Sequence, residues 1–136
     1  MKFSFRPMIL SAMAFGLAVS ALAQEAPIQS TIQSQLDAFK AEDFARAFTY
    51  ASPTIKGIFG SPENFGRMVQ QGYPMVWQPG AVKMLGQRAE AGRIWQRVLV
   101  TDAAGRSFLL DYAMIETPGG WQIDGVQLIR QPQPTA

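Results

Sequence analysis

Hydrophobic residues follow two different patterns along the chain, and the pattern changes near residue 80. Before that point they recur every three or four positions, which is typical of helices with one buried face. The clearest such stripe comprises Ile28, Ile32, Leu36 and Phe39. After residue 80, runs rich in branched and aromatic residues alternate with short turns, which is typical of antiparallel strands. The sequence therefore predicts an α+β fold in which helices pack on one face of a sheet.

Three helices are expected in the first half of the chain. The first begins at Pro27 and breaks near residues 41–43, and the second starts at Phe44 and ends at Ser52-Pro53. A proline disfavours helical backbone in the residue before it, which explains the second end.

The third expected helix has the clearest start signal. Ser61 can accept from the free backbone N–H groups, Pro62 suits the first helical position, and Gly72 can end the helix. Residues 54–60 are expected to form a loop. Residues 73–80 contain two prolines, so they are expected to form an irregular connection and are a candidate for lining a cavity mouth.

Four strands are expected, forming one curved antiparallel sheet. Ala91-Gly92, Ala103-Ala104 and Pro118-Gly119 are expected at the centres of the turns. This register places Gln96 opposite Asp111 and Tyr112 opposite Gly125, and alternation then sorts the side chains into two faces. The face assigned to the helices carries Trp95, Arg97, Leu99, Phe108, Leu110, Tyr112, Met114, Glu116, Trp121, Ile123, Gln127 and Ile129. The other face carries Ile94, Gln96, Val98, Val100, Leu109, Asp111, Ala113, Ile115, Gln122, Asp124, Val126 and Leu128.

The N-terminus is typical of an export signal. Lys2 and Arg6 precede an apolar run over residues 8–22, and Ala21-Leu22-Ala23 is a cleavage motif. An uncleaved membrane anchor is the alternative, but the run is short and no stop-transfer charges follow. We therefore expect residues 1–23 to be a signal peptide, residues 24–130 one domain and residues 131–136 a disordered tail, with a periplasmic or secreted location and no stable membrane anchor.

Charge and composition exclude several classes of function. Without Lys2 and Arg6 the basic and acidic residues are equal in number, so neither a nucleic-acid groove nor an anionic-lipid surface is indicated. The chain contains no His and no Cys, which removes Ser-His-Asp and Cys-His catalysis and thiolate or imidazole metal sites. No phosphate-binding glycine motif is present. Neither a metal nor a cofactor is therefore expected.

The remaining chemistry rests on carboxylate, Tyr and Arg side chains. In the expected register Asp111 and Asp124 lie diagonally on one face, about 7–8 Å apart, where two carboxylates can divide acid and base roles. The alternative is that both lie on a solvated or interface face. On the helix face Trp95, Arg97 and Tyr112 are candidates for ligand binding. Arg97 there needs Glu116 or a bound anion as partner, unless it extends to solvent.

The order of elements and the motif Gly-Gly-Trp-Gln-Ile-Asp-Gly-Val at residues 119–126 resemble the nuclear transport factor 2-like superfamily. Within it, the chain is similar to an uncharacterised bacterial exported family, domain of unknown function 4864, over residues 28–129. The resemblance implies a cone-shaped, cystatin-like roll and a homodimer, but it transfers no active site. Some relatives in the superfamily are isomerases, dehydratases or hydrolases, and others are binding modules.

Two functions follow from these observations. The first is a non-catalytic exported module that binds a small apolar ligand or a protein partner as a homodimer packed sheet to sheet. The second is a pocket enzyme of isomerase, dehydratase or hydrolase type that uses carboxylate or Tyr acid–base chemistry. A carboxylate that points into the cavity between helices and sheet would favour the enzyme.

Overall fold

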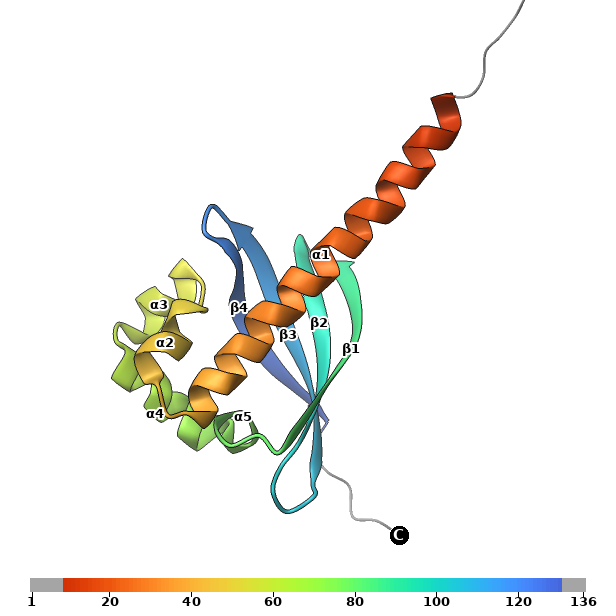
Figure 1. The fold of residues 1–136 in the computed structure, drawn as a ribbon. Coiled ribbons are helices and arrows are strands. Elements are labelled where there is room, and N and C mark those ends of the chain that lie inside the picture. Colours follow the sequence, from red (N-terminus) through yellow and green to blue (C-terminus); the bar gives the residue numbers. More distant parts are fainter. Residues whose placement is uncertain (1–8, 131–136) are drawn as a thin grey trace, which may run out of the picture.

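Five helices and four strands form two layers in the computed structural model, which describes residues 9–130, with side chains described for residues 24–129. The helices gather on one face of the sheet, and α1 crosses that face diagonally (Figure 1). This arrangement confirms the predicted α+β fold. The elements in chain order are α1 (Ile9–Lys40), α2 (Phe44–Thr49), α3 (Pro53–Phe59), α4 (Pro62–Gly72), α5 (Pro74–Trp77), β1 (Ala81–Glu90), β2 (Arg93–Thr101), β3 (Ser107–Thr117) and β4 (Gly120–Arg130).

Helix α1 is much longer than expected, because it begins at Ile9 and contains Pro27 instead of starting there. Residues 9–26 are rich in Ala and Leu, which have high helix propensity. The N-terminal part of α1 extends beyond the sheet (Figure 1). None of the described helices is both long and apolar enough to cross a membrane. Residues 1–8 of the expected signal peptide and the expected tail at residues 131–136 lie outside the described residues.

The prediction of a loop at residues 54–60 is wrong, because helix α3 occupies most of this segment. The Ser52 side chain accepts from the Ile55 N–H at 3.2 Å, and Pro53 takes the first helical position. Ser61 and Pro62 start α4 in the same way, as predicted. The expected irregular connection at residues 73–80 contains the short helix α5.

The sheet is a meander in the order β1-β2-β3-β4, and two of its three turns are as predicted. Glu90 pairs with Arg93 across a turn in which Ala91 and Gly92 have φ of 54° and 77°. Thr117 pairs with Gly120 across the last turn.

The turn between β2 and β3 differs, because Thr101 pairs with Ser107 across a five-residue loop. The Asp102 carboxylate stabilises this loop by accepting from the backbone N–H groups of Ala104 and Arg106. The loop moves the register by one residue, so Gln96 lies opposite Tyr112 and Arg97 opposite Asp111.

Three further irregularities shift the pairing inside the sheet. The first lies between Met84 and Gln87 in β1, and the other two make Asp124 and Ile129 extra residues of β4. A shift of one residue turns side chains to the opposite face, so the predicted faces are partly wrong. Trp95, Arg97, Leu99, Gln127 and Ile129 do not face the helices. The side chains packed against the helical layer are Ile94, Gln96, Val98, Val100, Phe108, Leu110, Tyr112, Met114, Trp121, Ile123, Val126 and Leu128.

The core lies between α1 and the inner face of the sheet. The predicted stripe on α1, from Ile28 to Phe39, is at most 1% exposed and packs with the strand residues of that face. Gln96 is a fully buried polar exception. Its amide N–H groups donate to the Leu85 and Arg97 carbonyls at 2.8 and 2.9 Å, so it supports the irregular part of β1.

Candidate functional site: the cavity between helices and sheet

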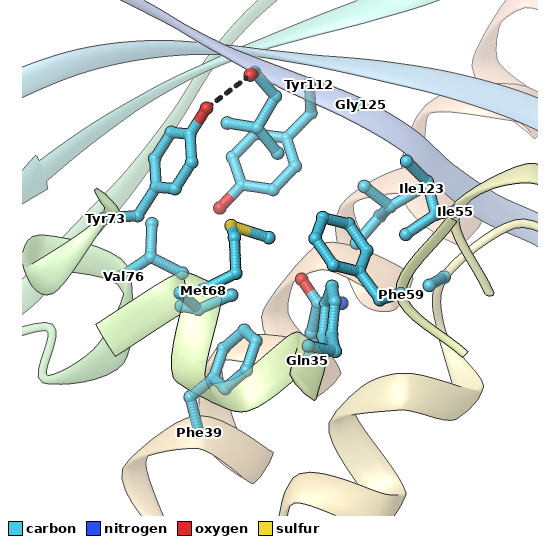
Figure 2. A pocket seen from close by; sticks show the side chains of 14 residues that line it. Gln35, Phe39, Ile55, Phe59, Met68, Tyr73, Val76, Tyr112, Ile123 and Gly125 are labelled. Carbon is cyan, nitrogen blue, oxygen red and sulfur yellow. Dashed lines mark hydrogen bonds between the residues drawn. The ribbon is translucent and has the colours of Figure 1, made fainter. Parts of the chain in front are cut away.

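A cavity of about 250 Å³ lies between the helices and strands β3 and β4 (Figure 2). The end of α1 and the short helices α3, α4 and α5 form one side, and the sheet forms the other. The cavity is therefore built where the two layers of the fold meet. The residues that line it are Gln35, Phe39, Ala51, Ile55, Phe59, Phe65, Met68, Val69, Tyr73, Val76, Tyr112, Ile123, Gly125 and Val126.

The helical side of the cavity follows from the spacing of residues along each helix. Residues three or four positions apart lie on the same face of a helix, so each helix turns a pair or triplet inward. These are Gln35 and Phe39 of α1, Ile55 and Phe59 of α3, and Phe65, Met68 and Val69 of α4.

Aromatic rings fix the helical side of the cavity. Phe65 is its centre, with ring centroids 5.8 Å from Phe39, 5.4 Å from Phe48 and 5.9 Å from Phe59. Such pairs add stability beyond the apolar area that they bury. The wall is thus formed before any ligand arrives.

Three polar side chains reach the cavity. The Tyr73 hydroxyl donates to the Val126 carbonyl at 3.1 Å. The Gln35 amide N–H donates to the Ala47 carbonyl at 3.1 Å, and its own carbonyl oxygen is turned toward the cavity (Figure 2). Tyr112 is completely buried, and its hydroxyl has no hydrogen-bond partner within the described part of the chain. Burial, with a smaller effect from Tyr73, raises the pKa of Tyr112, so the hydroxyl stays neutral and can donate.

No lining residue carries a charge. Tyr112 therefore has no carboxylate beside it in the cavity, and the acid–base pair that the enzyme hypothesis needs is not assembled there. What the arrangement can do is hold an apolar molecule and offer it a hydrogen bond.

Trp95, Arg97 and Asp111, three of the five predicted site residues, lie on the opposite face of the sheet. Arg97 donates to both carboxylate oxygens of Asp111, at 3.0 and 2.8 Å, so its partner is neither Glu116 nor a bound anion. Arg88 approaches the same carboxylate to 3.0 Å and lies over the Trp95 ring at 5.5 Å. The hydrogen bonds from Arg97 and Arg88 lower the pKa of Asp111, which keeps it ionised. The group is a structural ion-pair cluster.

Asp124, the last of these candidates, connects the sheet to α3. Its carboxylate accepts from the Ser52 hydroxyl at 2.7 Å and forms an ion pair with Arg93 at 2.9 Å. Asp111 and Asp124 thus each form an ion pair with an arginine of the sheet. Tyr112 alone among the five candidates lines the cavity.

Sequence reasoning missed two lining residues, Ile55 and Phe59, because it missed α3. The Ser52-Pro53 pair carries the same start signal as Ser61-Pro62, and this signal could have located Ile55 and Phe59. Residues 73–80 were expected to line a cavity mouth, and two of them, Tyr73 and Val76, do line the cavity.

Comparisons with known proteins identify the family of the chain. No curated protein matches its sequence. The solved structure of a phospholipid-binding protein from Ralstonia solanacearum, in complex with a phospholipid, is similar over 78% of each chain, with 17% sequence identity and a TM-score of 0.47. Residues 21–136 match the family described as Domain of unknown function (DUF4864), and the chain therefore belongs to that family.

Proposed function

We propose that this protein is a binding module that holds one small apolar ligand in the cavity between its helices and its sheet. The observation that carries the proposal is the lining, which is apolar except for Tyr112, Tyr73 and Gln35. Small-molecule sites are typically concave and apolar with a few polar groups that orient the ligand. The absence of a charged residue among the lining side chains favours binding over acid–base catalysis.

Native mass spectrometry of freshly purified protein tests this proposal. We expect a co-purifying small molecule on the wild type that is lost from Met68→Trp, because Met68 lies in the cavity wall and the larger ring fills the space. Ile58→Trp is the matched control, since Ile58 is 66% exposed and does not line the cavity. Equal occupancy in the wild type and both variants would refute the cavity as the binding site.

The fold is best placed in the nuclear transport factor 2-like superfamily. Two features support this placement. One is the helical layer on one face of a four-stranded antiparallel sheet, and the other is the start of the last strand, where Trp121 and Ile123 follow a tight turn. Placement there is consistent with a ligand held between the two layers.

The module acts outside the cytoplasm after cleavage behind Ala23. The support is the basic start, the apolar run and the Ala-Leu-Ala motif. Intact-mass analysis of exported protein should give a chain that begins at Gln24. A mass that includes residues 1–23 would overturn the proposal.

The protein forms a two-fold homodimer through the outer face of the sheet, which the helices leave uncovered (Figure 1). Leu99, Leu109 and Ile115 are only partly buried there, and Ile129 is 41% exposed. Asp111 is already paired with Arg97 within the chain, so a second copy can pack on the face without leaving that charge unpaired. An uncovered sheet face with several partly exposed apolar side chains suits a two-fold dimer.

Sedimentation velocity at micromolar concentration tests the dimer. Leu109→Lys should convert it to a monomer, whereas Ile58→Lys, on the helical side, should leave it dimeric. A wild type that sediments as a monomer throughout this range would refute the interface.

A further inference from the structure

We infer that the ligand of the cavity is a neutral molecule with one carbonyl or hydroxyl oxygen, and that this oxygen accepts a hydrogen bond from Tyr112. The inference rests on the proposed function, because it specifies the chemistry of the molecule that the cavity binds. It follows from the hydrogen bonds, the charges and the volume of the site.

The Tyr112 hydroxyl is a buried donor that finds no acceptor among the described residues. Buried polar side chains are nearly always hydrogen-bonded, because an unsatisfied buried group costs free energy. The Tyr73 hydroxyl satisfies this rule by donating to the Val126 carbonyl, and the Gln35 side-chain nitrogen by donating to the Ala47 carbonyl. Tyr112 has no such partner among the described residues, although its side chain is completely buried. Figure 2 shows its hydroxyl pointing from the sheet into the cavity.

The lining carries no charge, and this favours a neutral ligand. A carboxylate, phosphate or ammonium group moved from water into an apolar site loses its hydration and needs an opposite charge or several hydrogen bonds. None of the 14 lining residues is charged. A single phenol donor is enough for a carbonyl or hydroxyl oxygen but cannot compensate a full negative charge.

The volume limits the size of the ligand. The cavity of about 250 Å³ is larger than an apolar cavity of roughly 150 Å³ that binds benzene. It is smaller than the roughly 300–1,000 Å³ of sites for drug-sized molecules. A substituted benzene or a chain of similar size therefore fits.

Three probes of nearly equal size separate the possibilities: acetophenone, ethylbenzene and benzoate. Acetophenone offers a carbonyl oxygen, ethylbenzene has no acceptor, and benzoate is an anion at neutral pH. We propose to titrate each into the full chain by calorimetry, with the wild type, Tyr112→Phe and Tyr73→Phe. Tyr73→Phe is the matched control, because it removes a hydroxyl from the same cavity, and this hydroxyl already donates its hydrogen to the Val126 carbonyl.

The expected order on the wild type is acetophenone first, ethylbenzene about 3- to 10-fold weaker and benzoate weakest, the ratio that one net hydrogen bond gives. Tyr112→Phe should lose that advantage for acetophenone while its affinity for ethylbenzene is unchanged. Tyr73→Phe should keep the preference for acetophenone.

The contrary outcomes are distinct. If acetophenone and ethylbenzene bind equally well to the wild type, the cavity binds ligands but Tyr112 is not the recognition group, and the inference is overturned. Preference for benzoate would overturn it as well. If none of the three probes binds, both this inference and the proposed function fail. Should Tyr112→Phe not fold, the three affinities of the wild type still decide the question.

Discussion

Replacing Tyr112 by Phe should not destabilise the protein, although Tyr112 is one of its most deeply buried side chains. The ring stays in place, and the hydroxyl that is removed makes no hydrogen bond to the described residues. An unsatisfied buried polar group costs about 1–3 kcal/mol, so its removal should raise the free energy of unfolding by up to that amount. Tyr73→Phe should have the opposite effect. It breaks the hydrogen bond to the Val126 carbonyl and should cost about 0.5–1.5 kcal/mol.

Urea unfolding at pH 7, followed by tryptophan fluorescence, measures both changes. The protein should first be refolded from urea, so that any co-purified ligand is removed and does not add its binding energy. Both variants lose a hydroxyl from a tyrosine that lines the same cavity. Effects common to any Tyr→Phe substitution therefore cancel when the two changes in the free energy of unfolding are compared. If Tyr112→Phe lowers the free energy of unfolding as much as Tyr73→Phe does, the Tyr112 hydroxyl has a partner in the folded protein. The inference about the ligand would then lose its basis.

Three other substitutions test the structural account outside the cavity. Ser52→Ala should cost about 0.5–2 kcal/mol in urea unfolding, because it removes the cap of α3 and the hydrogen bond to Asp124; a cost near zero would contradict both contacts. Gln96→Leu should cost about 1–3 kcal/mol, since the Leu85 carbonyl loses its donor, and unchanged stability would show that this carbonyl is satisfied otherwise. Asp111→Asn should remove part of the acid sensitivity. Because Arg97 lowers the pKa of Asp111 in the folded state, its contribution is present at pH 7 and is lost as the pH falls through that lowered pKa. Unfolding midpoints of wild type and variant should therefore converge as the pH falls below about 4, the ordinary pKa of an aspartate, and a constant gap would refute the ion pair as its cause.

The sequence was sufficient for the layers of the fold, because periodicity and turn residues are local signals. The stripe on α1, the start of α4 and the turns at Ala91–Gly92 and Pro118–Gly119 follow from a few neighbouring residues each. Helix α3 was missed although its start signal was equally local, since the run that follows Pro53 is short and contains Gly57, which has low helix propensity.

The register between β2 and β3 could not be read from the sequence. The segment from Asp102 to Arg106 is compatible with turns of different length, and the Asp102 carboxylate decides among them through hydrogen bonds that only the folded loop shows. This one-residue difference moved Arg97 from the predicted face, which it was to share with Tyr112, to the opposite face and an ion pair with Asp111. An error of one residue in register turns a strand residue to the other face, so a candidate site built from strand residues is predicted correctly only when the register is.

The meander also has a consequence for the order in which the molecule assembles. Every strand pairs with its neighbour in the chain, so the sheet closes only short loops as it forms. The helical layer joins it through distant residues, such as Thr31 and Trp121, whose hydrogen bond spans 90 positions. The sheet is thus expected to form before the helices dock on it. The cavity lies along this boundary, so its walls are completed in the last step of folding and can separate while the strands stay paired.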